Sequence, residues 1–324
     1  MIAFINYPFQ AYVLRCYLTS NNIKKTIFVV IREYNKVKGL TDTKTIKRCL
    51  DDKNIKYIIV KDGISKLKIL PIFGIFFLNK NIIVGDILNK FNTIFLNFSL
   101  KRMVTVLLED GTSFHVDSKE INDELTRYSI DICYCISGIP IGKYEKLKIV
   151  LGDNSPITNI EFAKTPYQTP YKFIILGSPL IEHNTCSELD YRKDLEQIMR
   201  YIEPSKYNGN VVYFRHRREN ERRLRQTFST VLKRAWDIRR SIIGFDLDML
   251  SLTAHHYLDN KILISFPSTV ILILAQNNLL NNCEQLCLKR PLKITNPNQQ
   301  ERSDRIFDIC VNVLTEKGVN YVVL

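Results

Sequence analysis

The stretch that decides the fold is MIAFINYPFQAYVLRCYLTSNNIKKTIFVVI, residues 1–31 of a 324-residue chain. Residues 2–5 form a short apolar run, and residues 9–18 carry apolar side chains at helical spacing. Residues 26–31 form a continuous run that is rich in β-branched side chains, which is typical of a strand buried on both faces. Strand, helix and buried strand in this order predict a doubly wound parallel sheet. Further short strands are expected at residues 57–60, 82–84, 93–97 and 103–108.

A second α/β unit begins at residues 173–176, after a stretch at 152–170 that contains three prolines and many turn formers. It continues with a helix at 187–202, a strand at 210–214, a very basic helix, a strand at 261–266 and a helix at about 303–316 that ends at Gly318. The predicted organisation is two Rossmann-like domains, 1–155 and 171–324, joined by a linker at 156–170 and facing each other across a cleft. The helix at 187–202 is expected to bury one apolar stripe, which consists of Leu189, Leu195, Ile198, Met199 and Ile202.

The composition narrows the class of partner. The 46 Lys and Arg exceed the 33 Asp and Glu, and the net charge of +13 favours an anionic partner such as a nucleotide, a nucleic acid or an acidic lipid. The longest apolar runs, 69–78 and 263–275, fall short of the ~20 residues that a membrane-spanning helix needs. No secretory signal is recognisable, so the expected location is cytoplasmic. The eight cysteines lack metal-ligand spacing and are expected to be buried free thiols, with Cys133 and Cys135 on opposite faces of a strand.

Polar residues cluster after three predicted strands, where ligands bind in open parallel sheets. Glu109-Asp110-Gly111 places two carboxylates and a glycine at the first of these ends. One carboxylate beside another can have its pKa raised, which suits a general base, although Asp-Gly is also a common turn.

The second cluster is Arg215-His216-Arg217-Arg218-Glu219, between a strand and a helix start. Histidine and arginine side chains can bind a phosphate there together with helix N-terminal amides. Residues 211–240 hold nine Arg and one Lys against three acids, so the outer arginines are interpreted as a solvated face or a face for anionic lipid or nucleic acid. These outer arginines are Arg222, Arg223, Arg225, Arg239 and Arg240.

The third cluster is Ser268-Thr269, at the start of a helix that follows a strand. Its hydroxyls can cap the helix or bind a phosphate, and capping is the more frequent role.

The order of these motifs resembles bacterial sialyltransferases, most closely the lipooligosaccharide and capsule enzymes of glycosyltransferase family 52. Their acidic-acidic-Gly motif is similar to Glu109-Asp110-Gly111, their histidine motif to His216-Arg217-Arg218-Glu219, and their Ser/Thr motif to Ser268-Thr269. The opening Asn6-Tyr7-Pro8-Phe9-Gln10 is similar to the family's Thr-Pro-Leu/Phe-Gln signature. Two departures are Arg215, where the family often has proline, and Tyr7 in the usual threonine position.

The resemblance implies a GT-B fold and an inverting, metal-independent transfer of sialic acid from CMP-sialic acid to a terminal galactose-type sugar. The N-terminal domain would hold the acceptor and the general base Asp110, and the C-terminal domain would hold the donor. His216 would be the second catalytic residue. The remaining residues expected at the donor are Glu109, Gly111, Gly177, Ser178, Arg217, Arg218, Glu219, Ser268, Thr269, Pro8 and Gln10.

No cofactor and no metal are implied. The acceptor is expected to be a lipid-linked oligosaccharide, with peripheral contact to the anionic inner face of the cell membrane, and a homodimer remains open. Two alternatives stand beside this hypothesis. The same scaffold could use another nucleotide sugar, because fold does not fix the donor. A basic protein could instead bind nucleic acid through residues 211–240, although no nucleic-acid-binding motif is recognisable.

Overall fold

The computed structural model divides the chain into two compact units, Met1–Ile160 and Glu161–Leu324. The structure describes residues 1–33, 43–50, 54–61, 70–79, 81–98, 104–109, 119–128, 130, 132–136, 148–151, 171–202, 211–216, 218–231, 237–240 and 257–324. The predicted linker at 156–170 lies outside these residues.

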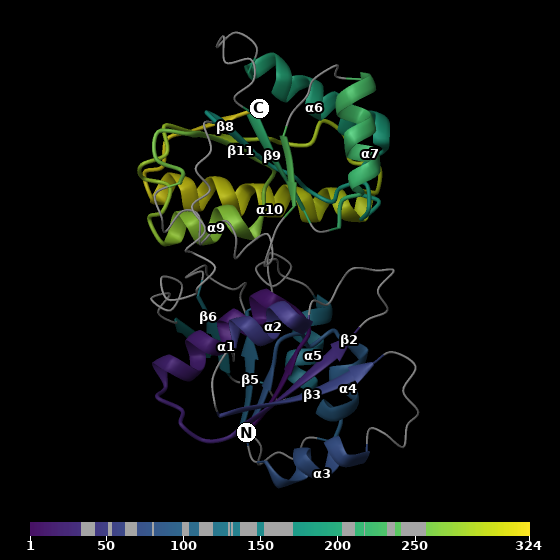
Figure 1. The fold of residues 1–324 in the computed structure, drawn as a ribbon, viewed down its shortest axis with the longest axis vertical. Coiled ribbons are helices and arrows are strands. Elements are labelled where there is room, and N and C mark those ends of the chain that lie inside the picture. Colours follow the sequence, from purple (N-terminus) through teal and green to yellow (C-terminus); the bar gives the residue numbers. More distant parts are fainter. Residues whose placement is uncertain are drawn as a thin grey trace. The chain divides into compact units, whose positions relative to one another are not determined.

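The first unit is a parallel sheet with the strand order β3-β2-β1-β4-β5-β6-β7. Figure 1 labels β2, β3, β5 and β6 of this sheet, with helices α1–α5. Its chain order reverses between β1 and β4, which is the topological switch point of a doubly wound sheet. The strands are β1 (Ile2–Ile5), β2 (Ile27–Glu33), β3 (Ile55–Lys61), β4 (Asn81–Val84), β5 (Val104–Leu108), β6 (Ile132–Cys135) and β7 (Lys148–Leu151). The helices are α1 (Pro8–Ser20), α2 (Thr43–Cys49), α3 (Leu70–Leu78), α4 (Lys90–Leu96) and α5 (Lys119–Arg127).

The strand predicted at 93–97 is wrong, because these residues belong to helix α4. The Asn89 side chain caps this helix by accepting the Phe91 N–H at 2.9 Å. Phe91 and Phe95 are buried at helical spacing, and the Phe95 ring lies 4.8 Å from that of Phe4 in β1. A five-residue apolar run can belong to a strand or a helix, and here the cap and the aromatic core decide for the helix.

The second unit is also a parallel sheet, with the order β10-β9-β8-β11-β12-β13 and its reversal between β8 and β11. The strands are β8 (Phe173–Leu176), β9 (Val211–Arg215), β10 (Asp237–Arg240), β11 (Ile262–Ser265), β12 (Gln285–Leu288) and β13 (Tyr321–Val323). The helices are α6 (Glu188–Ile202), α7 (Glu221–Gln226) with the π-helical turn η7 (Thr227–Val231), α9 (Thr269–Gln276) and α10 (Pro297–Glu316). The prediction of two doubly wound parallel sheets is therefore confirmed.

Details of the second unit differ from expectation. The predicted basic helix is present as α7 but is short, and Arg239 and Arg240 of the basic stretch lie on strand β10. Leu189 is 59% exposed, so it does not belong to the buried stripe of α6. Helix α10 begins at Pro297, and Gly318 follows it with a φ of +65°, the left-handed conformation that suits a glycine after a helix.

The cysteines are free thiols, as expected, and only Cys283 among them is partly exposed. The placement of Cys133 and Cys135 on opposite faces is wrong. Residues two apart on a strand share a face, and their Sγ atoms lie 3.4 Å apart in the buried core. Among the described helices, none is long and apolar enough to cross a bilayer.

Candidate functional site

The switch point of the second sheet brings together two predicted segments. Strands β8 and β11 are direct neighbours, with Leu176 paired to Ser265 at their carboxyl ends. Gly177 and Ser178 follow β8, and Ser268 and Thr269 follow β11. Ligands of open α/β sheets bind in the crevice that forms where the strand order reverses. Gly177-Ser178 and Ser268-Thr269 therefore flank the expected binding position of this unit.

His216 lies at the carboxyl end of β9, the strand next to β8. Its backbone N–H donates to Glu219 Oε2 at 2.7 Å, and its ring Nδ1 accepts the Arg218 backbone N–H at 3.2 Å. In the neutral ring this places the proton on Nε2, so Nε2 is a hydrogen-bond donor. Arg215, which departs from the family pattern, is 7% exposed, and its guanidinium donates to the Glu219 carbonyl at 2.5 Å. We call residues 215–219 the His216 loop; these hydrogen bonds hold it at both ends.

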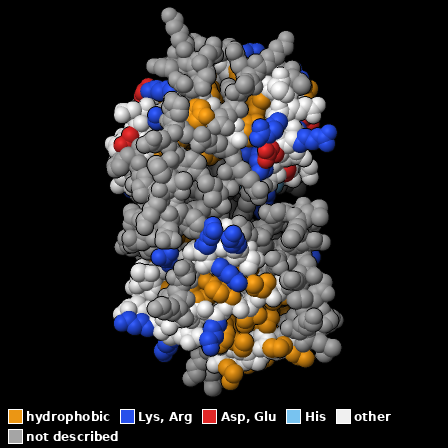
Figure 2. Space-filling model, viewed as in Figure 1, with side chains coloured by type: hydrophobic (Ala, Val, Ile, Leu, Met, Phe, Trp, Pro, Cys, Tyr) orange, Lys and Arg blue, Asp and Glu red, His pale blue; other side chains and the backbone are white. Residues whose placement is uncertain are grey.

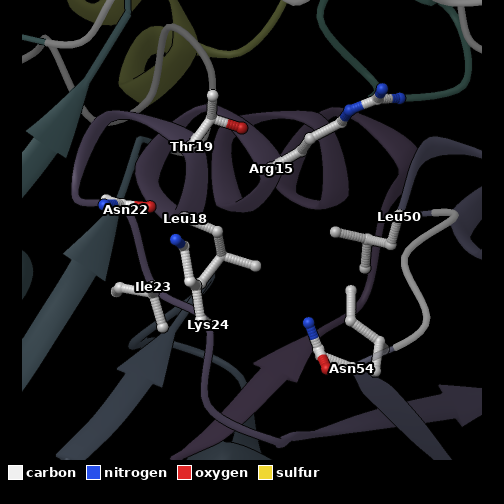
Figure 3. A pocket seen from close by; sticks show the side chains of 9 residues that line it. Arg15, Leu18, Thr19, Asn22, Ile23, Lys24, Leu50 and Asn54 are labelled. Atoms are coloured by element: carbon white, nitrogen blue, oxygen red, sulfur yellow. The ribbon is translucent and has the colours of Figure 1, made fainter.

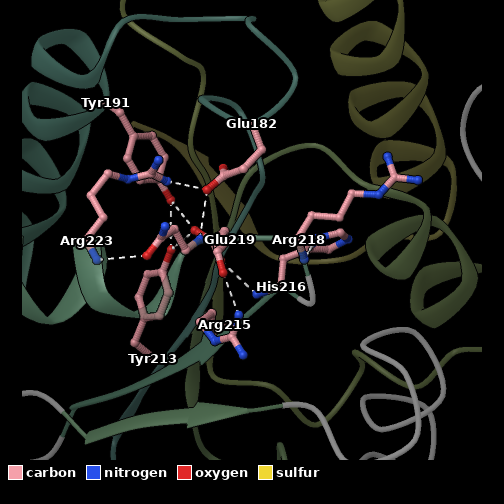
Figure 4. A network of polar contacts seen from close by, with 9 residues as sticks. Glu182, Tyr191, Tyr213, Arg215, His216, Arg218, Glu219 and Arg223 are labelled. Atoms are coloured by element: carbon pink, nitrogen blue, oxygen red, sulfur yellow. Dashed lines mark hydrogen bonds and ion pairs between the residues drawn. The ribbon is translucent and has the colours of Figure 1, made fainter. Parts of the chain in front are cut away.

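The Glu219 side chain lies beneath this loop, 2% exposed. Its Oε1 accepts the Tyr191 hydroxyl at 2.9 Å and the Tyr213 hydroxyl at 2.6 Å, from helix α6 and strand β9 (Figure 4). Burial raises the pKa of Glu219 from 4.5 to about 7, against the opposing effect of the hydrogen bonds from Tyr213, His216 and Tyr191. Glu219 therefore acts on the loop from inside the protein.

Gly177 is what allows Glu219 to occupy this position. A Cβ atom on Gly177 would overlap Glu219 Oε2 and lie 2.6 Å from the Tyr213 hydroxyl. The Gly177 N–H donates to the Phe214 carbonyl at 2.9 Å, and the Ser178 N–H bonds to the Tyr191 hydroxyl. Glycine at this position thus serves close packing between the β8 and β9 loops.

A second set of contacts joins the same two loops. Glu182 accepts the Asn220 N–H at 2.8 Å and an Arg223 guanidinium N–H at 2.5 Å. Arg218 Nη1 lies 2.6 Å from His183 Nε2, and burial, together with the Arg218 charge, lowers the pKa of His183. Sequence reasoning assigned no role to Glu182 or His183. No local motif marks them, because their partners lie more than thirty residues away in sequence.

Ser268 occupies the N-cap position of α9, but its side chain makes no capping hydrogen bond. Its Oγ is buried and has no partner among the described residues. Thr269 is the first helical residue and is 9% exposed. The more frequent capping role is therefore not seen for Ser268, and its hydroxyl has spare hydrogen-bonding capacity.

The outer arginines do not form one solvated face. Arg223 is paired with Glu182 and its side chain is 20% exposed, whereas Arg222 and Arg225 are exposed. Arg225 bonds Glu221 at 2.9 Å, one helical turn away. Arg217 lies outside the described residues.

In the first unit, Glu109 follows β5 directly, and Asp110 and Gly111 lie outside the described residues. Glu109 is fully buried, and its Oε2 accepts the Ile136 N–H at 2.8 Å after β6. Like Glu219, it binds a backbone group of a neighbouring loop. Its carboxylate therefore faces the protein interior.

Pro8 and Gln10 organise the switch point of this first sheet. Pro8 opens helix α1, where the missing N–H costs nothing. Gln10 is fully buried, accepts the Asn6 N–H at 2.8 Å and donates to the Gly85 carbonyl at 2.8 Å after β4. Asn6 is 1% exposed, and its Nδ2 has no partner among the described residues.

Asp86 is a candidate that sequence reasoning missed. It follows Gly85 at the end of β4, and burial raises its pKa although the Leu88 and Asn89 N–H groups oppose the shift. The signal was present as Gly85-Asp86 directly after an apolar strand, the same pattern that drew attention to Glu109-Asp110-Gly111.

A pocket of about 330 Å³ lies elsewhere in the first unit, between α1, α2 and the starts of β2 and β3 (Figure 3). Its lining includes Arg15, Thr19, Lys24 and Asn54. These lie near the amino ends of β2 and β3, the edge opposite to the one that binds ligands in such sheets. Across the described residues, no three His, Cys, Asp or Glu side chains are grouped to hold a metal ion.

By sequence, the chain matches no protein-family model and no curated protein at a significant level. By structure, it is similar to a Listeria monocytogenes protein with a provisional UDP-N-acetylglucosamine 2-epimerase assignment, at a TM-score of 0.51 and 13% identity over 98% of this chain and 88% of that chain. A second UDP-N-acetylglucosamine 2-epimerase matches at a TM-score of 0.50 and 13% identity, over 97% and 87%. At this identity the likeness shows the fold alone. The chain has a GT-B-like fold with two parallel Rossmann-like sheets.

Proposed function

We propose that this chain is a nucleotide-sugar enzyme and that it transfers sialic acid from CMP-sialic acid to a terminal galactose-type sugar of a lipooligosaccharide or capsular glycan. The observation that carries the proposal is the fastened His216 loop beside the switch point of the second sheet, in a chain whose motifs resemble the sialyltransferases. The GT-B-like fold supports it, since both structural matches bear the name of an enzyme for a nucleotide sugar.

The second unit would hold the donor. His216 Nε2–H and the Ser268 hydroxyl would donate to the phosphate of CMP, with Ser178, Thr269, Arg217 and Arg218 around it. Donors fixed before the reaction stabilise the charge that develops on the leaving phosphate without reorganisation. Glu219 and Gly177 would not touch the donor. Glu219 is buried against Gly177, and the two hold the loops that carry His216 and Ser178.

The first unit would supply the base. The oxygen of the acceptor hydroxyl would attack the anomeric carbon as CMP departs. Asp110 would take the proton of that hydroxyl. Asp110 directly follows Glu109, whose carboxylate fastens the neighbouring loop through Ile136. No metal takes part in this proposal, since histidine and hydroxyl donors would do the work of a bound cation.

A second candidate follows from the names of the structural matches, which are both UDP-N-acetylglucosamine 2-epimerases. The chain would then bind a UDP-sugar and epimerise or transfer it. The base in this case would come from the edge of the first sheet, where Asp86 is partly buried beside Gly85.

A donor panel separates the candidates. Purified protein is incubated with CMP-sialic acid, UDP-N-acetylglucosamine and other nucleotide sugars, with a lactose-type acceptor, and released CMP or UDP is measured. The proposal expects CMP release that falls roughly 10²-fold or more in His216→Ala. Arg225→Ala is the matched control, because Arg225 is exposed and bonds only within its own helix in the described contacts. UDP release or epimerisation would favour the second candidate, and RNA binding without turnover would refute both.

A further inference from the structure

Helix α3 lies on the surface of the first unit but has no polar side chain. Its nine residues read Leu-Pro-Ile-Phe-Gly-Ile-Phe-Phe-Leu, and only Ile72 and Phe76 are buried. Leu70, Phe77 and Leu78 are 60%, 51% and 86% exposed. A surface helix of a globular protein normally turns charged or polar residues outward. The outer face of α3 therefore requires an explanation other than core packing.

The apolar face of α3 continues onto helix α4. The Phe73 ring lies 6.2 Å from that of Phe77 and 5.3 Å from that of Phe98, which follows α4 and is 53% exposed. Ile94, one turn before Phe98, is 41% exposed. We call the set Leu70, Phe73, Phe77, Leu78, Ile94 and Phe98 the α3–α4 surface. Figure 2 shows hydrophobic side chains gathered over these two helices, and contiguous exposed patches of this kind mark interaction sites.

The sequence around helices α3 and α4 is mainly cationic, and two of the described cations, Lys90 and Arg127, lie beside the α3–α4 surface. Between residues 64 and 103 the sequence holds six Lys and Arg and a single acid, Asp86. Lys90 is exposed and precedes Ile94 and Phe98 by four and eight residues. This spacing places the three side chains on the same face of α4. The Arg127 side chain is 58% exposed; it donates to the Asn97 side chain next to Phe98 at 3.1 Å and forms an ion pair with Glu124 at 3.5 Å.

We propose that the α3–α4 surface binds the anionic surface of a lipid bilayer, with Leu70, Phe77, Leu78 and Phe98 entering the boundary between headgroups and acyl chains. Aromatic and leucine side chains on one face with Lys and Arg at its edge are the composition of helices that lie in that boundary. Each Lys or Arg close to an anionic leaflet adds to the attraction. The protein would thus rest on the membrane through its first unit, not through the arginines of α7, two of which are paired with Glu182 and Glu221.

A second copy of the chain fits this surface less well. A twofold interface brings identical patches together, so Lys90 and Arg127 would each approach the cations of the other copy. Like charges across an interface oppose association. A bilayer rich in acidic lipid meets the same cations with opposite charge.

The test is cosedimentation of the full chain with vesicles, without donor or acceptor, so that it stands apart from the proposed reaction. The vesicles contain phosphatidylcholine alone or an equimolar mixture with phosphatidylglycerol. Phe77→Gln/Leu78→Gln changes two exposed side chains of the α3–α4 surface. Leu189→Gln/Leu292→Gln is the matched control, since these leucines of the second unit are 59% and 55% exposed.

The proposal expects binding to the acidic vesicles, with the affinity lowered roughly tenfold or more by the Phe77/Leu78 change and unaltered in the control. Lys90→Glu should weaken binding, and its effect should shrink as salt is added, whereas Arg225→Glu should have little effect. Equal binding by the Phe77/Leu78 variant, or no preference for acidic lipid, would overturn it. A wild type that ignores vesicles but dimerises, with dimers lost in the Phe77/Leu78 variant, would assign the surface to a second copy.

Discussion

The pKa of Glu219 gives the chain a pH dependence of stability whose sign can be worked out. In the native state the carboxyl titrates at about 7, against 4.5 for a solvated side chain, mainly because it is buried. Between these values the native protein keeps a proton that the unfolded chain has lost. The native state then binds more protons, so stability falls as pH rises. The stabilisation contributed by Glu219 is fully present below pH 4.5 and is lost above about pH 7.

The size of the effect follows from the shift. A difference between 4.5 and about 7 corresponds to about 3 kcal/mol, since one pKa unit is worth 1.36 kcal/mol. His183 acts in the opposite direction, because its pKa is lowered and its neutral form is favoured in the folded state. The contribution of Glu219 is therefore isolated by comparing the wild type with Glu219→Gln.

Glutamine can keep the hydrogen bonds without titrating. Its oxygen can accept the His216 N–H, and its NH₂ can donate to the Tyr191 and Tyr213 hydroxyls, which can both accept. We expect the Glu219→Gln unfolding free energy to lack the fall of about 3 kcal/mol that the wild type shows between pH 4.5 and 7.5. Glu219→Ala leaves those donors without the carboxylate and should lose about 2–4 kcal/mol near neutral pH.

Urea unfolding followed by tryptophan emission measures this directly. Trp236 is the single tryptophan and belongs to the unit Glu161–Leu324, so its signal reports on the unit that contains Glu219. Glu316→Gln, a change at an exposed position near the end of α10, serves as the control. The reasoning is refuted if wild type and Glu219→Gln show the same pH dependence, or if the wild type gains stability relative to the variant as pH rises.

Three further predictions concern the reaction and the packing beneath it. Asp110→Asn should lower transfer at least about 10²-fold while CMP binding persists, and near-normal turnover in an acceptor assay would leave Asp110 as a turn residue. Chelation with EDTA should leave transfer largely intact; loss restored by Mg²⁺ or Mn²⁺ would show that a cation acts at the phosphate. Gly177→Ala should destabilise the second unit by about 1–3 kcal/mol in the same urea assay, because the methyl would overlap Glu219 Oε2. Gly74→Ala lies in the first unit and has nothing within 4 Å of the added methyl, so it should be neutral or slightly stabilising when urea unfolding is followed by far-UV circular dichroism, which reports on both units. An equal loss in both variants would contradict the packing argument.

Sequence pattern predicted the sheets well because their central strands are buried on both faces. The continuous apolar runs that gave β2, β8 and β11 leave little choice of structure. It failed at α4, where a short apolar run has no period of its own and the Asn89 cap decides. It also predicted no strand between the basic helix and residues 261–266, where residues 237–240 pair with β9 as strand β10.

The strand-end positions of the candidate residues were predicted from sequence, but the contacts that hold these residues were not. His216 and Ser268 follow strands, and a strand end can be recognised from sequence. The roles of Tyr191, Tyr213 and Glu182 could not be, because each acts through a partner from another element. Gly177 was expected to approach a nucleotide, whereas in the structure it makes room for the protein's own carboxylate.

In each unit a buried glutamate of a predicted motif accepts a backbone N–H from a loop at a strand end. Glu109 and Glu219 are 0% and 2% exposed, and each accepts a backbone N–H from a loop at a strand end, Ile136 and His216, at 2.8 and 2.7 Å. A buried carboxylate costs free energy, and an apolar residue of similar volume would often give a more stable unit. That apolar residue would leave the loop N–H without an acceptor and free the loop to move. The proposed reaction needs Asp110 and His216 held within fractions of an ångström, and the fixed loops beside them would supply that rigidity at a cost in stability.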